Sequence, residues 1–341
     1  MRRVLVGVVL WLLIGRATVN AEDGRGEEPV AQRWASSFIE ENDLIFRTDR
    51  HYTQGIKVTL MPPERAWDEK GLMSLIPAWG YEPQFVRVGF GIGQNIYTPA
   101  DISVPTLLTN DRPYAGYLYF STMFHRRGMT TYNHAVLESL ELELGVVGPW
   151  ALGGEAQTWV HEIRGFALPQ GWSNQLKNEP GIRIKALRAH RWRWEPWAPI
   201  GVDLIPHLGV SLGTVENSAQ LSGMFRAGLN LPDDFGVRTL DSLTTDSGGY
   251  DANWNRNHSW GAYGFISLTA KAVGQNIFLD GNIFHGSHHI TKQTVTADAI
   301  AGGVLVLRRF ELGFVLTIRG KEYAGQTEFD GFGTVYGKVK F

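Results

Sequence analysis

The chain has 341 residues, of which 43% are hydrophobic and 12% aromatic, and its formal net charge is −2. Cysteine is absent, which excludes a disulfide framework and any thiolate metal site or nucleophile. The near-neutral charge, without a basic arm or a phosphate-binding loop, gives no reason to expect a nucleic-acid partner.

Residues 1–21 have the pattern of a secretory signal peptide. Two arginines precede an apolar run over residues 4–14, and Val19-Asn20-Ala21 supplies small residues at the expected cleavage spacing. We therefore predict that the mature protein begins near Glu22 and that residues 22–341 form one domain. No later window holds the roughly 18 consecutive apolar residues of a spanning helix. An exported chain of this kind is predicted to be a β-barrel.

Apolar and polar residues alternate along much of the chain with the period of two of a barrel strand. Over residues 139–146, apolar residues at even positions alternate with Glu141 and Glu143, so both carboxylates are predicted to face inward. The last run ends on Phe341, which resembles the signal that outer-membrane barrels present to the barrel assembly machinery, an expected partner. We predict strands near residues 34–46, 52–61, 84–96, 114–125, 135–147, 181–190, 200–213, 219–229, 261–272, 294–308, 311–320 and 330–341.

A further candidate strand, residues 276–284, is short and interrupted by Asp280-Gly281-Asn282. Single-chain bacterial barrels have an even number of strands with both ends in the periplasm. We therefore predict an all-β fold, a transmembrane antiparallel β-barrel of 12 strands, in which residues 276–290 form an outward excursion. The residues 308–311 then form a short periplasmic turn, and residues 232–260 an unusually long periplasmic connection.

The same strand count places tryptophans at a periplasmic interface, where amphipathic rings are favoured. They are Trp192, Trp194 and Trp197. It also places three polar segments at the extracellular end of the barrel: residues 43–52, 97–114 and 149–180.

The last of these segments is predicted to contain a short helix over residues 154–164. Gln157, His161 and Arg164 are spaced by four and three residues, which puts them on one helical face. Because the unperturbed pKa of histidine lies near neutrality, His161 can act as a general base. The alternative is an ordinary surface histidine.

Asn42 and Asp43 offer hard oxygen ligands, which suit calcium better than zinc where no cysteine or paired histidine is near. Their alternative role is an Asx turn or a polar lumen lining. Thr53 begins the next strand, close to Asp43 in a regular hairpin, and can orient a ligand or substrate. Candidate serines such as Ser121 and Ser173 lack a Gly-x-Ser-x-Gly context, so water activated by histidine beside a metal is the better hydrolytic scheme.

Seven short motifs between about residues 40 and 180 occur in an order that resembles the outer-membrane lipid A 3′-O-deacylase family. The second half of the chain shows only barrel periodicity and the terminal phenylalanine. The motifs are Asn42-Asp43, Tyr52-Thr53-x-Gly55, Gln94-Asn95-Ile96-Tyr97-Thr98-Pro99, Asp111-Arg112-Pro113-Tyr114-Ala115, Gly145-Val146-Val147-Gly148-Pro149, Gly153-Gly154 with Gln157 and His161, and Gly171-Trp172-x-x-Gln175-Leu176-x-Asn178.

This resemblance implies a twelve-stranded outer-membrane barrel and a calcium-dependent esterase that removes the 3′-linked acyloxyacyl group from lipid A of lipopolysaccharide. His161 would be the general base that activates water, Asn42 and Asp43 would help build the Ca²⁺ and catalytic site, and Thr53 would support it. The site is expected at the extracellular face, where lipopolysaccharide forms the neighbouring leaflet.

Two positions depart from the family pattern. Where a family member can present a lysine to a lipid A phosphate, this chain has Asp101-Ile102-Ser103-Val104, and where a glutamate can follow the histidine by six positions it has Ala167. Arg112 and Arg164 are candidate phosphate contacts, and Gln157 is a candidate substrate contact. Two other functions stay open: a non-enzymatic channel or adhesin, and a different outer-membrane lipid hydrolase such as a serine phospholipase.

Overall fold

The computed structural model describes residues 33–43, 50–67, 72–237, 239–240 and 257–341. These residues form one antiparallel sheet that closes on itself, because the first strand pairs with both the second and the last. The strands are β1 (Ala35–Asn42), β2 (His51–Met61), β3 (Arg65–Ala66), β4 (Glu82–Thr98), β5 (Ala115–Met129), β6 (Ala135–Val147), β7 (Glu179–Trp197), β8 (Ile200–Gly213), β9 (Glu216–Leu229), β10 (Trp260–Asn276), β11 (Val295–Leu307), β12 (Phe310–Arg319) and β13 (Asp330–Lys340).

Twelve of these strands make the wall, because β3 has two residues and is a side branch paired with β4. The predicted 12-stranded barrel is confirmed, and Ile277–Asp280 form the short helix α4 instead of a further wall strand. The largest difference in strand length is at β7, which was predicted to end near residue 190 and continues to Trp197. The predicted signal peptide lies outside the described residues.

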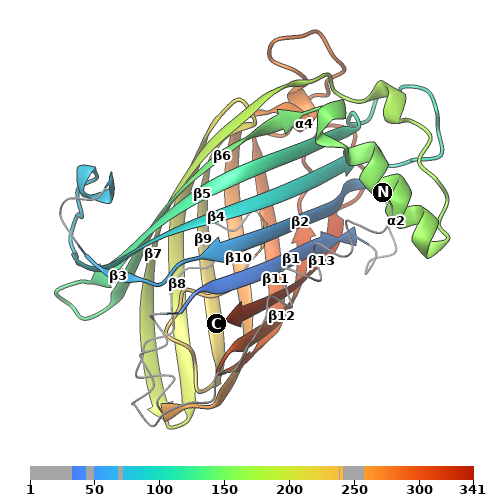
Figure 1. Ribbon diagram of the computed structural model, residues 1–341. Coiled ribbons are helices and arrows are strands. Elements are labelled where there is room, and N and C mark those ends of the chain that lie inside the picture. The colour runs from blue at the N-terminus through green and yellow to red at the C-terminus, as the bar shows by residue number, and fades with distance from the viewer. Residues whose placement is uncertain (1–32, 44–49, 68–71, 238, 241–256) are drawn as a thin grey trace.

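The two ends of the barrel differ in what they carry. One end, here named the α2 end, bears α4, the 3-10 helices η4 (Pro149–Ala151) and η5 (Trp172–Asn174), and the helix α2 (Gly153–Arg164) (Figure 1). The other end, named the Phe341 end, bears the last residue and the short connections after β5, β7 and β11, with the 3-10 helix η3 (Leu72–Leu75).

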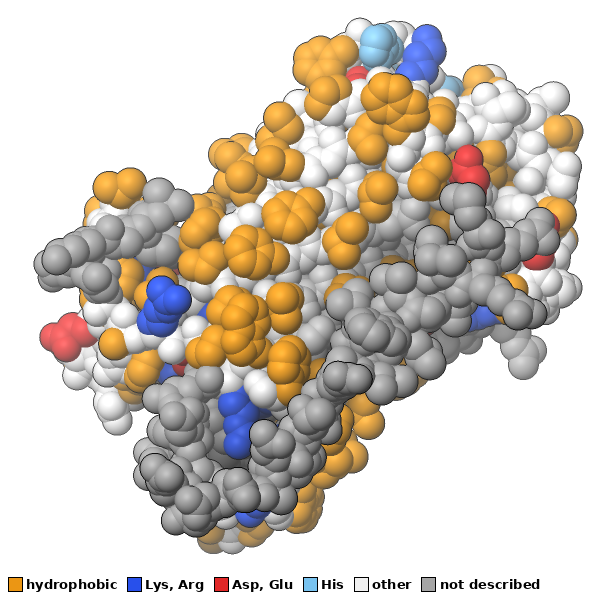
Figure 2. All heavy atoms as spheres, viewed as in Figure 1, with side chains coloured by type: hydrophobic (Ala, Val, Ile, Leu, Met, Phe, Trp, Pro, Cys, Tyr) orange, Lys and Arg blue, Asp and Glu red, His pale blue; other side chains and the backbone are white. Residues whose placement is uncertain are grey.

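The outer wall is apolar. Along β12, residues with even numbers are exposed and those with odd numbers are buried up to residue 318, and the exposed set includes Leu312 (56%) and Ile318 (51%). Figure 2 shows hydrophobic side chains spread over the strand wall with few charged side chains among them. None of the helices in the described part of the chain has the length and apolar character to span a membrane.

The lumen is filled by ion pairs. Lys57 Nζ lies 2.6 Å from Glu141 Oε1, and Lys185 Nζ lies 2.8 Å from Glu141 Oε2 and 2.7 Å from Glu143 Oε1. Arg183 Nε completes the cluster at 2.7 Å from Glu143 Oε2. The prediction that Glu141 and Glu143 face inward is confirmed, since both are almost fully buried.

The connection after β9 differs from the predicted periplasmic loop. Its described residues from 231 to 240 fold into the lumen, where Phe235 and Val237 are buried. Arg226, on β9, forms an ion pair with Asp234. At the far end of this segment, the backbone amide of Leu240 donates a 2.7 Å hydrogen bond to Glu41 Oε1. The segment enters because it supplies both apolar side chains and a carboxylate to a buried guanidinium, which is costly to leave unpaired.

Candidate active site

The first part of the site is the outer end of the β1–β2 hairpin. Asn42 pairs with Gln54 across the two strands, so Asp43 and Thr53 are the next pair of opposed positions toward the connection. Along β1, buried and partly exposed residues alternate, which turns Asn42 away from the lumen. Asp43 Oδ2 accepts a 2.8 Å hydrogen bond from the amide of Arg50, and this bond joins the two ends of the connection.

Thr53 lies at a bulge in the β2–β4 pairing. The register shifts between Tyr52 and Gln54, and the Thr53 hydroxyl is 2.7 Å from the hydroxyl of Thr98. Bulges re-aim side chains at strand ends. The structure therefore places Asn42, Asp43 and Thr53 at the same end of the β1–β2 hairpin, as the sequence predicted, and Asp43 and Thr53 are buried there.

Helix α2 confirms the predicted helix over residues 154–164 and begins one residue earlier. It starts against the outer wall, since Gln94, on β4, donates a 2.6 Å hydrogen bond to the carbonyl of Ala151. A Cβ atom added to Gly153 would lie 3.1 Å from the Cα of Gly116 on β5. The absence of side chains at these two positions lets the helix lie directly on the strand.

The inner face of α2 carries Gly153, Gln157 and His161, which are buried. His161 Nδ1 lies 2.6 Å from the carbonyl oxygen of Ala167. Because a carbonyl only accepts, Nδ1 carries the hydrogen and Nε2 is the basic nitrogen of the ring. Ala167, six positions after the histidine, thus orients the imidazole through its backbone carbonyl.

Gln157 has a structural partner. Its Oε1 accepts a 2.8 Å hydrogen bond from Nε1 of Trp172, whose ring packs 5.0 Å from that of Tyr114. Gln157 was predicted as a substrate contact. In the structure it connects α2 to η5 and so helps to hold the helix that carries His161.

An ion pair spans the two parts of the site. Arg164 Nη2 lies 3.9 Å from Glu40 Oε1, with side-chain exposures of 40% and 33%. Glu40 is two residues from Asn42, and Arg164 three from His161, so the helix and the hairpin occupy one sector of the outer wall. Sequence reasoning missed Glu40, although a carboxylate at an outward position of a barrel strand was the available signal.

Arg112 lies elsewhere. Its side chain is fully buried, its Nη1 is 3.0 Å from Glu322 Oε2, and its guanidinium lies over the ring of Tyr97. The structure does not bring Arg112 to the His161 sector, which leaves Arg164 as the predicted phosphate contact there.

A second group of polar residues at the α2 end was not predicted. His51 Nδ1 lies 2.6 Å from Asp330 Oδ1, and its Nε2 lies 2.7 Å from the hydroxyl of Tyr323. Tyr323 in turn donates a 2.5 Å hydrogen bond to Asp111. Burial and this carboxylate raise the pKa of Tyr323 well above its usual value, so the phenol stays protonated. The group ties together three connections that are far apart in sequence.

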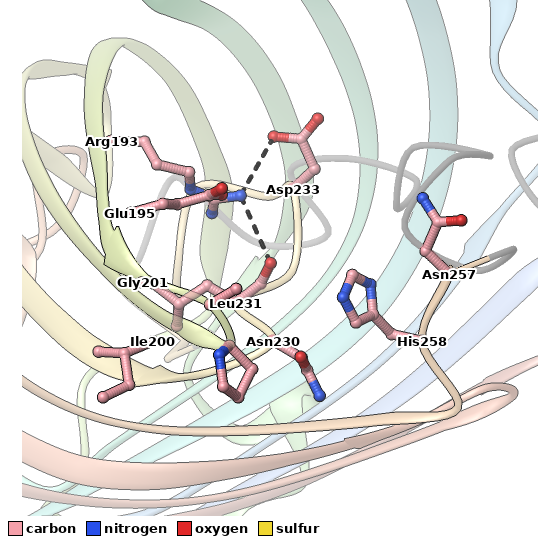
Figure 3. A pocket seen from close by; sticks show the side chains of 11 residues that line it. Arg193, Glu195, Ile200, Gly201, Asn230, Leu231, Asp233, Asn257 and His258 are labelled. Carbon is pink, nitrogen blue, oxygen red and sulfur yellow. Dashed lines mark hydrogen bonds and ion pairs between the residues drawn. The ribbon is translucent and has the colours of Figure 1, made fainter.

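A pocket of about 250 Å³ lies at the Phe341 end, lined by residues that include Arg193, Asp233 and His258 (Figure 3). The Arg193 side chain is turned to Asp233 and to the carbonyl of Leu231. This pocket is at the end of the barrel opposite α2, so it is not part of the His161 sector. Among the residues that the structure describes, no group of three or more histidines and carboxylates is arranged to hold a metal ion.

Comparison with known proteins identifies the family. A family model described as "Outer membrane protein LpxR" matches residues 6–341. The chain belongs to the LpxR family. The resemblance drawn from residues 40–180 is thus confirmed, and the match extends through the second half, where the sequence showed only barrel periodicity.

One solved structure has the same fold. LpxR from Salmonella typhimurium superposes with a TM-score of 0.70 at 16% sequence identity, covering 90% of this chain and 100% of that one. The β domain of the Bordetella autotransporter BrkA, with a TM-score of 0.45 and 9% identity, covers 91% of this chain and 98% of its own. No curated protein matches by sequence. As a member of this family with a closed barrel, the chain is an outer-membrane protein.

Proposed function

We propose that this protein is a lipid A deacylase that hydrolyses the ester of the 3′-linked acyloxyacyl group in a calcium-dependent reaction. The observation that carries the proposal is the position of His161. It lies on the inner face of a helix seated on the outer wall, in the same sector as Asn42 and Asp43. A site on the wall meets lipid from the membrane side. The α2 end would then be the extracellular face.

His161 is the proposed general base. With its Nδ1–H donated to the Ala167 carbonyl, Nε2 takes a proton from water while the water oxygen attacks the ester carbonyl carbon. The bond between the acyl carbon and the 3′ oxygen then breaks, and the leaving 3′ oxygen takes the proton that Nε2 of His161 removed from water. The products are the acyloxyacyl acid and the 3′ hydroxyl of lipid A.

The residues at the end of β1 suit calcium. Asp43 and Asn42 provide carboxylate and amide oxygens, the hard ligands that calcium prefers, and further ligands would come from backbone, water or substrate. Bound calcium would polarise the ester carbonyl and stabilise the negative charge that develops on its oxygen. Thr53 would support the hairpin that carries both ligands. Arg164 would meet a lipid A phosphate.

The direct test uses purified protein and lipid A with added calcium, and mass spectrometry of the product. We expect lipid A to lose the mass of the 3′ acyloxyacyl group. A calcium chelator should abolish this loss, and excess calcium should restore it. An unchanged lipid A mass with a folded barrel would contradict the proposal. If the product forms at the same rate in the presence of the chelator, the protein is an esterase that does not require calcium.

The filled lumen favours the enzyme over a channel. The ion pairs among Lys57, Glu141, Glu143 and Lys185 cross the barrel interior, and residues 231–237, 239 and 240 enter it from the Phe341 end. A serine hydrolase is less favoured, because Ser121 is fully buried and faces the lumen beside Lys57. Hydrolysis of glycerophospholipid that survives chelation and is blocked by a serine reagent would support that alternative.

A further inference from the structure

The outward side of α2 carries an exposed apolar stripe, bordered by the exposed carboxylates Glu155 and Glu162. Leu152, which precedes the helix, Trp159 and Ile163 are spaced by seven and four residues, which places them in one stripe. Their exposures are 51%, 41% and 64%. At 100° per residue, Trp159 and Ile163 lie on the side of the helix opposite His161, and Leu152 is exposed at its start. We name these three residues the α2 stripe.

The α2 stripe points away from the protein because three contacts fix the inner face on the wall. These are the hydrogen bond from Gln94 to Ala151, the close approach of Gly153 to Gly116, and the ion pair between Arg164 and Glu40. They lie at the beginning and the end of the helix. The helix therefore lies along the outer surface of the barrel and presents the stripe outward.

The helix is at the level of the apolar wall. Gln94, which holds its beginning, is two residues, or about 7 Å, from Ile92, which is 55% exposed on the same strand. Glu40, which holds its end, pairs across the sheet with Val335, which is 53% exposed. Both attachment points thus border exposed apolar side chains of the membrane-facing wall.

We propose that the α2 stripe inserts among the acyl chains of the surrounding outer leaflet, so that α2 is an interfacial membrane helix fixed to the barrel wall. The stripe is continuous with the lipid-facing surface of an outer-membrane barrel, and an amphipathic helix with one apolar face is the element that lies in such an interface. The occupant is bulk lipid of the bilayer, which contacts the stripe in the absence of any substrate.

The consequence for the site rests on the proposed deacylase function. Lipid on the stripe and the wall on the inner face hold α2 from both sides, which fixes His161 at the depth of the membrane boundary. An ester of an embedded lipid lies at that boundary. The stripe would therefore support turnover of bilayer substrate more than turnover of substrate dispersed in detergent.

The absence of cysteine allows a clean test. We would make Ile163→Cys and Leu152→Cys, attach a nitroxide, reconstitute each variant in bilayers without lipid A, and measure by EPR the accessibility to oxygen and to a water-soluble nickel complex. Phe120→Cys on the apolar wall, 50% exposed, is the lipid reference. Tyr132→Cys on the β5–β6 turn, 87% exposed, is the aqueous reference.

The expected result is high oxygen and low nickel accessibility at both stripe positions, close to the Phe120→Cys values. Nickel accessibility close to that of Tyr132→Cys would place the stripe in water and overturn the proposal. An immobilised label shielded from both reagents would mean that protein covers the stripe. Dipolar broadening that disappears on dilution with unlabelled protein would identify a second copy as the occupant. Each of these also overturns it.

A second measurement links the stripe to the site. The double variant Trp159→Gln/Ile163→Gln is expected to lower turnover of lipid A in vesicles by about tenfold, as expected for lost burial of apolar side chains, with little change in detergent micelles. Equal losses in both media would show a structural role only. If wild-type protein has no activity in either medium, the deacylase proposal fails while the EPR result stands.

Discussion

The lumen and the outer wall at the α2 end both hold charged side chains, but with different geometry. In the lumen, Lys57 and Glu141 are 2.6 Å apart and almost fully buried. On the wall, Glu40 and Arg164 are 3.9 Å apart and partly exposed. Buried charges must be closely paired for the barrel to be stable. Polar residues on a lipid-facing wall have no such structural need, which makes them candidates for a functional role.

The largest effect is expected for Asp43→Ala. If Asp43 is a calcium ligand, its loss should lower turnover of lipid A at least about 100-fold, while the barrel remains folded because Asp43 lies at the end of its strand. Initial rates measured over a range of calcium concentrations check this. If Asp43→Ala hydrolyses lipid A at the wild-type rate at the same calcium concentration, Asp43 is not a calcium ligand.

An effect on stability instead of turnover is expected for Lys57→Met in the lumen. Removing one cation from Glu141 should lower the free energy of unfolding by about 3 kcal/mol, as for other broken buried pairs, although Lys185 still contacts the carboxylate. Denaturant unfolding in lipid measures this. The matched variant Lys57→Met/Glu141→Gln should recover part of the loss. Reduced turnover with unchanged stability would contradict the assignment of a structural role to the charged residues of the lumen.

The smallest effect is expected for the ion pair between α2 and β1. Glu40→Gln and Arg164→Gln should each lower turnover by no more than about fivefold, since partly exposed pairs contribute up to about 1 kcal/mol. A double-mutant cycle on turnover should show coupling between the two positions. Purely additive losses would mean that the pair does not position the helix, and losses as large as that of Asp43→Ala would give one of them a direct role.

The sequence predicted features that repeat or are local. Alternation with a period of two identified the twelve wall strands and the inward direction of Glu141 and Glu143, because one face of every strand meets lipid. The helix that carries His161 was predicted because its spacing is local to residues 154–164. Parity of the strand count excluded residues 276–284 from the wall, and the short helix α4 confirms this.

Features that depend on long-range pairing were not predicted. The described residues between 231 and 240 enter the lumen because of their contacts with Arg226 and Glu41. Glu41 is 199 residues from Leu240, whose backbone amide donates to its carboxylate. Arg112 was predicted as a candidate phosphate contact, and the structure pairs its guanidinium with Glu322, which is 210 residues away in the sequence. In neither case does the local sequence pattern specify the contact. A polar connection has the same kind of sequence whether it faces solvent or folds into the lumen.

The central claim is that an outward-facing helix on the wall supplies the base for ester hydrolysis. Mass spectrometry of lipid A after incubation with calcium and the His161→Ala variant tests it most directly, with His134→Ala, at the opposite end of the barrel, as the control. We expect at least about 100-fold slower loss of the 3′ acyloxyacyl group in His161→Ala, and an unchanged rate in His134→Ala. Wild-type turnover by a folded His161→Ala barrel would contradict the account.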